Sequence, residues 1–512
     1  MLLRVKSMLN TSAIRSHFPA FSEDRIILDA TASTQIPQPL LDYKSKSSRF
    51  YANVHRGKYS ASNITTLAYE AGFTVAANLI NARSIKEIVM GQGTTDVINC
   101  VKNSLRPEFK DGDNIVTTAL EHNANFVSWK AGLIPELAQY GRNIELRIVD
   151  FDHKTGELDI SQLKDFVDER TKLLTVTGAS NFMGTKTNIN ELAKIAHQGG
   201  YTQPNGREGA YILVDGAQLV PSTFVDVQAS DLDFLVWSYH KMSSAQGLGG
   251  LFIRQEIGET LAPFAHGGDH VEEVSRDKIK FKNLPWKFMI GTPNILETIG
   301  SGFGTSFLIN AGLGHIYDES ASVDEQKDLR GKQILTNILM YTGRCDDPKI
   351  QFSEIPYNST NTDQQACMEF LTNHPEIAEI MQDPSERLKF TQKSVRNAMQ
   401  NITLHEEQIM QPTLNILSEI PEVTIYGPLD ARLRSPLISM NIGGLDPHDV
   451  SREINRSKYG FVESRSGNHC ASIAHKDLDV EATLRISGYI YTNLADLDTA
   501  VNAIKDISRS VI

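Results

Sequence analysis

The chain has 512 residues, of which 40% are hydrophobic and 22% are charged, close to the average of globular proteins. It carries 62 Asp and Glu against 50 Lys and Arg, and the formal net charge of −12 argues against nucleic acid or an anionic membrane surface as the main partner. No run approaches the roughly 18 apolar residues of a membrane helix, and the first residues lack the pattern of a signal peptide. Four cysteines at unrelated spacings indicate neither a disulfide framework nor a zinc site, so we expect a cytoplasmic protein.

Short β-rich runs alternate with helical stretches from residue 26 to residue 313, after an N-terminal segment (1–25) that carries little signal. The alternation predicts an α/β fold, with a large domain built on a mostly parallel seven-stranded sheet. The predicted strands are residues 87–90, 115–119, 144–150, 173–177, 211–214, 234–237 and 251–254, and the predicted helices between them are 96–105, 161–167 and 189–197. Ligands of such sheets bind at the carboxyl ends of the strands, so the residues that follow each strand matter most.

Residues 314–388 interrupt this alternation, because they are rich in Asp, Glu, Gln and Asn and contain several prolines. We expect an insertion there that is helical or irregular. Residues 389–512 predict a smaller α+β C-terminal domain. Its predicted elements are a long helix over 394–416, strands at 423–426, 437–442, 461–463 and 483–486, a helix near 447–457 and a final helix.

Two of the predicted strands are followed by side chains that suit the same chemistry. Asp215 follows strand 211–214, and Lys241 follows strand 234–237. A lysine in such a place can be partly desolvated, which lowers its pKa and makes it a nucleophile toward carbonyl groups. Alone, the Asp is as well explained as a helix cap and the Lys as a surface residue. Together they suit pyridoxal phosphate, whose pyridine nitrogen pairs with a carboxylate and whose aldehyde forms an imine with a lysine.

Two further segments fit that cofactor. Gly93, Thr94 and Thr95 precede helix 96–105, where backbone N–H groups, hydroxyls and the helix dipole favour a phosphate. His122 follows strand 115–119 and could stack on the cofactor ring, although a lone histidine is more often structural.

In chain order, the motifs GTT, EHNAN, DGAQ, SYHK and GTPN resemble those of the class V aminotransferase fold family. More narrowly, they are similar to the SufS/CsdA-type cysteine desulfurases and selenocysteine lyases, over about residues 20–310 and 395–510. The resemblance implies a pyridoxal phosphate-dependent transferase of fold type I, a homodimer and an amino-acid substrate.

The resemblance also implies roles for individual residues. Lys241 would carry the cofactor, Asp215 would pair with the pyridine nitrogen, and His122 would stack on the ring. The other implied cofactor contacts are Thr94, Thr95, Gln218, Ser238 and His240, with Thr292 reaching across from a dimer partner. Asn181 would lie near the substrate carboxylate.

The segment from Arg465 to Ala471 contains Cys470, which matches the cysteine that takes sulfur from the substrate in the desulfurases and becomes a persulfide. Arg485 matches the arginine that binds the substrate carboxylate, with Arg465 as a second substrate-binding residue. Arg465 and His469 beside Cys470 favour a thiolate. A cysteine without this context is more often a small buried hydrophobic residue.

Some positions depart from the family pattern. Asn468 and His469 stand where two histidines are common, Ser472 and Ile473 stand where a proline is common, and Asn123 replaces a histidine in EHNAN. These departures leave other reactions open on the same cofactor: transamination, epimerisation or another C–S lyase reaction. A scaffold that has lost catalysis is a third alternative.

The insertion is absent from the compact members of the family, and it could cover the site or dock a partner such as a sulfur-acceptor protein. His266, Asp269 and His270 could bind a metal in principle. The resemblance instead implies a glycine-rich loop there, and we expect no metal.

Overall fold

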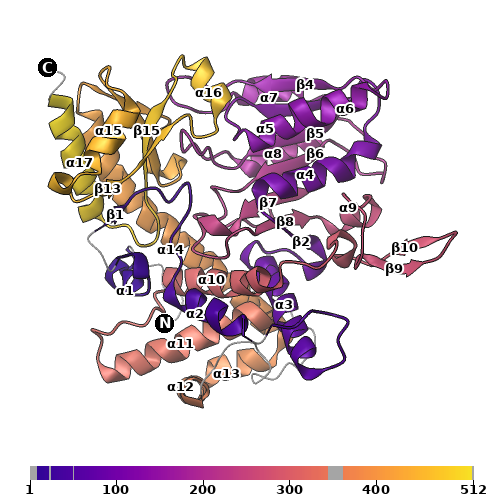
Figure 1. Cartoon of the computed structure of the whole chain (residues 1–512), viewed down its shortest axis with the longest axis horizontal. Coiled ribbons are helices and arrows are strands. Elements are labelled where there is room, and N and C mark those ends of the chain that lie inside the picture. Colours follow the sequence, from indigo (N-terminus) through magenta and orange to yellow (C-terminus); the bar gives the residue numbers. More distant parts are fainter. Residues whose placement is uncertain (1–7, 22–24, 50, 344–360, 510–512) are drawn as a thin grey trace.

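The computed structural model describes residues 8–21, 25–49, 51–343 and 361–509 (Figure 1). Its main sheet has seven strands in the order β2-β8-β7-β6-β5-β3-β4. These strands are β2 (Ile88–Gly91), β3 (Asn114–Thr118), β4 (Glu145–Val149), β5 (Thr171–Thr177), β6 (Tyr211–Asp215), β7 (Phe234–Ser238) and β8 (Gly249–Ile253). β8 runs antiparallel to both of its neighbours, β2 and β7, and the other six strands all run in one direction, so the predicted mostly parallel sheet of an α/β fold is confirmed.

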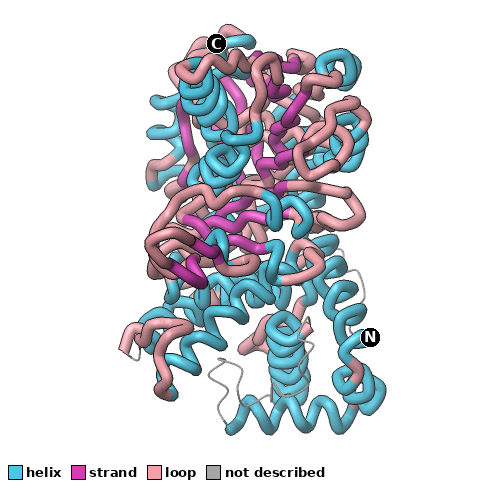
Figure 2. Tube along the Cα trace, turned by 90° about the vertical axis from the view of Figure 1, so that its right-hand side faces the viewer, coloured by secondary structure: helices cyan, strands magenta, loops and turns pink. Residues whose placement is uncertain are grey.

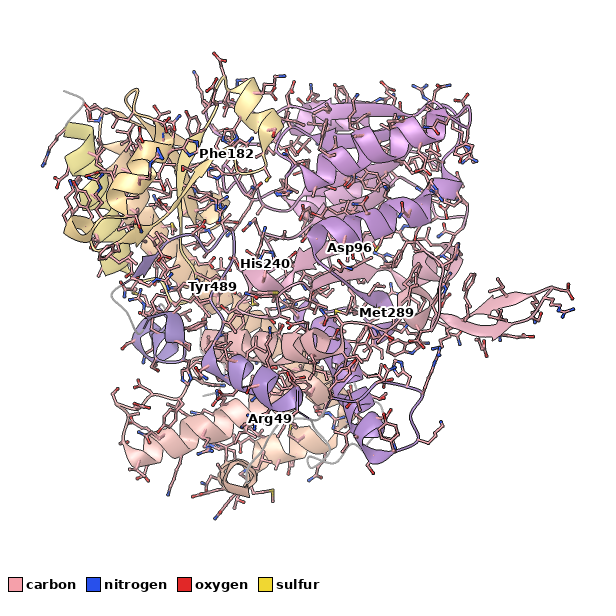
Figure 3. The ribbon with its side chains drawn as sticks, in the orientation of Figure 1. Arg49, Asp96, Phe182, His240, Met289 and Tyr489 are labelled. Atoms are coloured by element: carbon pink, nitrogen blue, oxygen red, sulfur yellow. The ribbon has the colours of Figure 1, made fainter. Side chains whose placement is uncertain are left out.

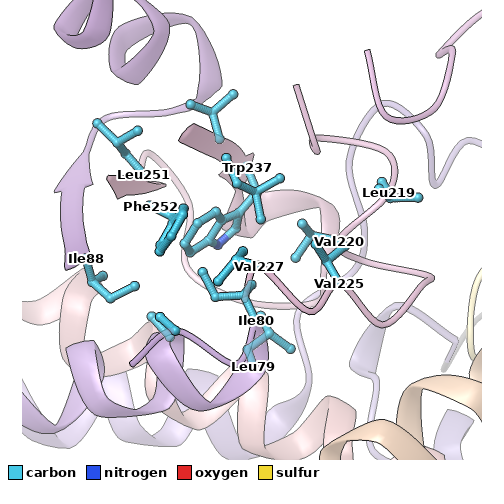
Figure 4. Packing of buried hydrophobic residues seen from close by; sticks show 14 of the residues in the cluster. Leu79, Ile80, Ile88, Leu219, Val220, Val225, Val227, Trp237, Leu251 and Phe252 are labelled. Atoms are coloured by element: carbon cyan, nitrogen blue, oxygen red, sulfur yellow. The ribbon is translucent and has the colours of Figure 1, made fainter. Parts of the chain in front are cut away.

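The central strands are buried because both of their faces are covered. Every residue of β5, β6, β7 and β8 is buried, as expected for central strands of a mostly parallel sheet between layers of helices. Trp237 of β7 packs among side chains of β2, β8 and the loop that contains Val227 (Figure 4). A Cβ on Gly250 of β8 would lie 2.1 Å from the Trp237 ring, so this packing requires glycine at that position.

Helices surround the sheet and follow the predicted pattern. Those between the strands are α4 (Thr94–Leu105), α5 (Ala124–Val127), α6 (Ile134–Ala138), α7 (Ile160–Phe166), α8 (Ile189–His197) and α9 (Gln255–Thr260). A layer of longer helices lies below the sheet (Figure 2). It contains α2 (Gln38–Ser47), α3 (Ser60–Leu79) and α10 (Ile295–Leu313), while α1 (Thr11–Arg15) lies near the N-terminus. Glycine lets α10 approach its neighbours closely, since a Cβ on Gly312 would lie 2.4 Å from the carbonyl oxygen of Ala398.

The described part of residues 314–388 is mostly helical. It contains α11 (Val323–Thr342), α12 (Asn361–Asn373), α13 (Pro375–Gln382) and the start of α14 (Pro384–Ser418). Buried side chains of α11, α12 and α13 belong to the main hydrophobic core. Residue 388, the predicted end of the insertion, lies within α14, and the predicted domain boundaries remain predictions. Cys345 lies outside the described residues.

The C-terminal part has its own antiparallel sheet, in the order β11-β12-β15-β14, with a separate core. Its strands are β11 (Val423–Tyr426), β12 (Leu437–Ile442), β14 (Arg465–Gly467) and β15 (Thr483–Ser487), and its helices are α15 (Pro447–Ile454), α16 (Ser472–Asp477) and α17 (Leu494–Ser508). The predicted α+β character is therefore confirmed. Near the start of the chain, β1 (Ile26–Ile27) pairs in parallel with β13 (Val462–Glu463).

One hairpin extends from the body of the molecule (Figure 1). It consists of β9 (Val271–Val274) and β10 (Ile279–Phe281), most of whose residues are exposed. None of the helices in the described ranges combines the length and apolar character that a bilayer-spanning helix needs.

Candidate active site

A cavity of about 880 Å³ lies where β5, β6 and β7 end, between the start of α4 and the C-terminal sheet. Figure 3 shows His240 in this region, between α4, marked by Asp96, and the C-terminal part of the chain. The cavity is lined by nearly all the residues that the sequence singles out: Thr94, Thr95, His122, Asn181, Asp215, Gln218, Ser238, His240, Lys241, Arg465, Cys470 and Arg485. Thr292 does not line it and lies exposed in the loop before α10. The fold thus brings together side chains that are hundreds of residues apart.

The start of α4 forms an anion-binding corner of the cavity. Gly93 is the N-cap residue and offers no side chain to the free N–H groups of the first turn. The Thr94 N–H donates to Ser238 Oγ (2.8 Å), and the two hydroxyl oxygens of these residues lie 2.6 Å apart. The helix dipole and these hydroxyls suit a phosphate group.

Lys241 ends a short 3-10 helix, Tyr239–Lys241, directly after β7. The segment is held from behind, since the His240 carbonyl accepts hydrogen bonds from the N–H and the hydroxyl of Thr34, both 2.9 Å long. Burial lowers the pKa of the Lys241 ammonium to about 8, although the negative charge of Asp215 opposes this shift. A substantial fraction of the amine is therefore neutral, and able to attack a carbonyl, at mildly alkaline pH.

Asp215 and His122 lie beside the lysine. Asp215 is the last residue of β6, and its Oδ1 accepts a hydrogen bond from the Ala217 N–H (3.0 Å). The Nδ1 of His122 accepts a hydrogen bond from the Ala124 N–H (3.0 Å), which places the imidazole proton on Nε2. Burial lowers the pKa of His122, so the ring is neutral at pH 7. A neutral ring is suited to stacking on a flat cofactor.

Glu121 supports this wall of the cavity and was not predicted from the sequence. It is buried and accepts hydrogen bonds from the Thr118 hydroxyl (2.7 Å), the Asn125 amide (2.6 Å) and the Thr177 N–H (2.7 Å). It thereby joins β3, α5 and β5 directly behind His122. In the sequence, the only indication of a role for Glu121 is its position next to His122 in EHNAN.

The Cys470 loop leads from β14 into α16. His469 and Cys470 both have left-handed backbones, with φ values of 52° and 55°. The Cys470 carbonyl accepts a hydrogen bond from the Asn123 N–H (2.7 Å). The Asn123 side chain donates to Ser472 Oγ (3.0 Å) and accepts from the Ser472 N–H (3.1 Å). Asn123 and Ser472, two departures from the family pattern, thus bind each other and attach the loop to the large part of the chain.

His469 does not supply the positive charge that we expected beside Cys470. Its side chain is buried, its Nε2 lies 3.0 Å from the Thr483 hydroxyl, and burial lowers its pKa to about 2. It is therefore neutral, and that expectation is wrong. The cationic side chains that line the cavity and interact electrostatically with Cys470 are Lys241, Arg465 and Arg485.

Arg485 and Asn181 both line the cavity. Arg485 lies on β15, and burial lowers its pKa to about 10, which leaves it charged at neutral pH. Its Nη1 donates to the Asn181 carbonyl (2.7 Å). Within the described residues, the buried Arg485 Nε and Asn181 Oδ1 have no hydrogen-bond partner. A charged guanidinium and an amide that line the same cavity suit the carboxylate and ammonium of an amino acid.

The other residues that the sequence singled out, the possible metal ligands and Cys100, do not line the cavity. In the described part of the chain, no group of three or more His, Cys, Asp or Glu side chains could hold a metal ion. His270 instead contacts the Lys287 carbonyl and the Gly267 N–H, each at 3.2 Å, and so stabilises its own loop. Cys100 is buried in α4, whereas Cys470 is exposed.

Comparison with known structures places this architecture among the fold-type-I pyridoxal phosphate enzymes. A cysteine desulfurase from Thermococcus onnurineus NA1 has a TM-score of 0.73 at 26% identity, over 99% of this chain and 100% of that one. The cysteine desulfurase CsdA of Escherichia coli, at 23% identity and a TM-score of 0.68 over 99% and 100% of the two chains, shows the same fold.

The model of the family "Aminotransferase class-V" matches residues 26–380 and 386–499, so the chain belongs to that family. A probable cysteine desulfurase of Halalkalibacterium halodurans and a cysteine desulfurase of Pectobacterium atrosepticum are each 28% identical to it over 504 residues. These alignments cover 97% of this chain and 98% and 97% of the two relatives.

Proposed function

We propose that this chain is a pyridoxal phosphate-dependent, desulfurase-like enzyme that removes sulfur from cysteine or a related amino acid through Cys470. The observation that carries the proposal is that Cys470, Lys241 and Arg485 line one cavity. The relatives named above carry the same activity in their names.

The residues present fit pyridoxal phosphate. Lys241 would hold its aldehyde carbon, Asp215 its pyridine nitrogen, and Gln218 its ring hydroxyl. The uncapped start of α4, with Thr94, Thr95, Ser238 and His240, would hold its phosphate. When bound, the cofactor supplies an electron sink for bonds at the Cα and Cβ atoms of an amino acid.

The residues that line the cavity would then each have a separate role in the reaction. Arg485 would bind the α-carboxylate, and Asn181 would orient the amino acid beside it. The amine of Lys241, once free, would take the proton from Cα, a role that suits a group whose pKa burial lowers to about 8. His122, neutral and half-buried, would exclude water from that face of the site.

Sulfur would be transferred from the substrate to Cys470 in a single nucleophilic displacement. The Cys470 thiolate attacks the sulfur of the substrate, an S–S bond forms and the Cβ–S bond breaks. The electron pair of the broken bond stays with Cβ, which takes up a proton. Cysteine and the Cys470 thiol thus become alanine and the Cys470 persulfide, with no outside oxidant or reductant.

The test is mass spectrometry of the Cys470 peptide after incubation with cysteine, together with measurement of the released alanine. The native chain should gain one sulfur atom on this peptide. Cys470→Ala should release no alanine by this route but still bind pyridoxal phosphate, and Cys100→Ala, at a buried cysteine, is the matched control. Undiminished alanine release from Cys470→Ala, or release of pyruvate or a keto acid instead of alanine, would refute the proposal.

The resemblance also underlies three finer proposals. In a homodimer, Thr292 of one chain would reach the site of the other. A sulfur-acceptor protein would take the persulfide sulfur from the exposed Cys470. The chain would work in the cytoplasm.

A further inference from the structure

Glu121 is a buried carboxylate that joins three elements directly before His122. It is 1% exposed. Its Oε1 accepts hydrogen bonds from the Thr118 hydroxyl at the end of β3 and from the Thr177 N–H at the end of β5, and its Oε2 accepts one from the Asn125 amide in α5. The register between β3 and β5 ends earlier along both strands. Glu121 therefore connects the two strand ends beyond the last residues that pair in the sheet.

The directions of these hydrogen bonds require an acceptor at both oxygens of Glu121. The oxygen of the Asn125 amide accepts from the Thr175 hydroxyl (2.7 Å) and from Trp129 Nε1 (3.3 Å). An indole N–H can only donate, so the Asn125 oxygen must face Trp129 and its NH2 group must face Glu121. The backbone N–H of Thr177 can also only donate. Two obligate donors therefore point at different oxygens of the same side chain, an arrangement that a carboxylate satisfies and an amide does not.

The orientation of His122 depends on how this segment is attached to the sheet. The imidazole accepts a hydrogen bond from the Ala124 N–H (3.0 Å), and the His122 carbonyl accepts one from the Asn125 N–H (2.9 Å). Both contacts lie within the same turn, so they fix the ring relative to the turn but not the turn relative to the sheet. The side chain of Glu121 supplies that second connection.

Thr177 extends the connection to Asp215. Thr177 of β5 and Asp215 of β6 are direct partners in the sheet register, and both line the cavity. The Gly178 N–H donates to the Asp215 carbonyl (2.8 Å), which continues the pairing at the end of the strands. By binding the N–H of Thr177, Glu121 therefore fixes His122 relative to Asp215. The two carboxylates also interact, because the negative charge of Asp215 adds to the effect of burial in raising the pKa of Glu121 to about 8.

We propose that Glu121 is a positioning residue that sets the orientation of His122 relative to Asp215, and thereby the orientation of the cofactor ring that these two side chains would contact. Glu121 acts through its neighbours, since it does not line the cavity itself. This inference rests on the proposed function, because it takes the flat molecule beside His122 to be pyridoxal phosphate.

The experiment uses the full chain loaded with pyridoxal phosphate and measures circular dichroism in the visible band of the cofactor, divided by its absorbance. This ratio reports how the bound ring is oriented in its asymmetric surroundings. Glu121→Gln sets an amide N–H against the Asn125 NH2 group, which cannot turn without losing Trp129. The variant should lose dichroism relative to the native chain and bind the cofactor about fivefold or more weakly, the lower end of what an unpaired buried donor costs.

An exchange variant separates this effect from the loss of a charge at one position. Glu121→Gln combined with Asn125→Asp reverses donor and acceptor in the same hydrogen bond. The new amide donates to the new carboxylate, which still accepts from Trp129 and Thr175. The ratio of dichroism to absorbance and the affinity for the cofactor should therefore return toward their native values.

Glu87→Gln is the matched control for a purely structural role. Glu87 is also 1% exposed, accepts hydrogen bonds from the N–H groups of Arg83 (2.7 Å) and Gln255 (3.1 Å), and does not line the cavity. Its substitution should lower the melting temperature and leave the dichroism ratio native. Thr118→Val, which removes one hydrogen bond to Glu121 without adding a donor, is the milder variant if Glu121→Gln does not fold, and it should lower the ratio in the same direction.

Two results would overturn the role of Glu121. One is a Glu121→Gln or Thr118→Val protein with a lowered melting temperature but a native dichroism ratio and native affinity, as expected of Glu87→Gln. The other is an exchange variant that folds and stays as impaired as Glu121→Gln. If the native chain formed no visible band with pyridoxal phosphate, the cofactor assignment itself would be refuted instead. These measurements involve no sulfur transfer, so they do not depend on Cys470.

Discussion

Gly249→Ala is the most direct test of the anion-binding corner, because its effect can be worked out from the distances between the added Cβ and the backbone of Gly93. Gly249 begins β8 between Gly91 of β2 and Ser238 of β7, its partners in the sheet register. A Cβ on Gly249 would lie 2.6 Å from the Cα and the carbonyl carbon of Gly93 and 2.8 Å from its nitrogen. Favourable carbon contacts lie near 3.5 Å or beyond, so about 1 Å of movement is needed. The sheet holds β8 on both sides, and the turn at Gly93 must therefore move.

Moving Gly93 displaces the N-cap of α4 and weakens the hydrogen bond from the Thr94 N–H to Ser238. Overpacking of this kind costs about 1–3 kcal/mol, which corresponds to a roughly 5- to 150-fold loss of affinity for a ligand held at this corner. The assay is titration of cofactor-free protein with pyridoxal phosphate, followed by absorbance. Gly268→Ala is the matched control, because its Cβ would meet no atom within 4 Å, and it should bind within about twofold of native. A Gly249→Ala protein with a native melting temperature and native affinity would refute the phosphate assignment.

Two further predictions concern Lys241 and the Cys470 loop. Because burial lowers the pKa of Lys241 to about 8, the neutral amine falls about tenfold for each pH unit below that value. The rate at which pyridoxal phosphate is incorporated should therefore rise from pH 6 to pH 8 and then level off, and a rate that is flat below pH 8 would contradict a desolvated Lys241. Asn123→Ala removes two hydrogen bonds to Ser472, so iodoacetamide should alkylate Cys470 faster, by up to about thirtyfold, as measured by mass spectrometry. Asn143→Ala, at an exposed asparagine, is the control, and equal alkylation rates in the two variants would show that Asn123 does not hold the loop.

The sequence predicted what depends on local pattern. The strands of the main sheet are apolar runs followed by polar residues, and each predicted end lies within two residues of the observed one. By contrast, β14 has the sequence Arg-Ser-Gly, with no apolar residue to mark it as a strand. Helix α10 is buried along most of its length and has no polar face to give it a helical period.

The site residues that the sequence missed act through partners distant in the chain. Arg465 binds the carboxylate of Asp29 only because the fold brings the two residues together across 436 positions of the chain. Asn123 was visible as a departure from the family pattern, but its meaning depends on Ser472, 349 residues away. The role of His469 was mistaken for a related reason, since its charge is set by burial that no local pattern reveals.

The distribution of charge in the cavity explains how its separate binding regions act together. Three histidines line it, and burial lowers the pKa of each: His240 to about 4, His469 to about 2, and His122 below its usual value. All three rings are neutral at pH 7, so the positive character of the cavity comes from other groups. At one side it comes from the uncapped start of α4, and on the C-terminal sheet it comes from Arg465 and Arg485.

Lys241 and Asp215 lie between these two positive regions, at the ends of neighbouring elements of the sheet. A ligand pair with an anion at each end meets this distribution: the phosphate of the cofactor at α4 and the α-carboxylate of an amino acid at Arg485. The reactive carbon of each molecule would then fall near the lysine. Because the histidines are neutral, activity near neutral pH should follow the titration of Lys241 rather than that of any imidazole.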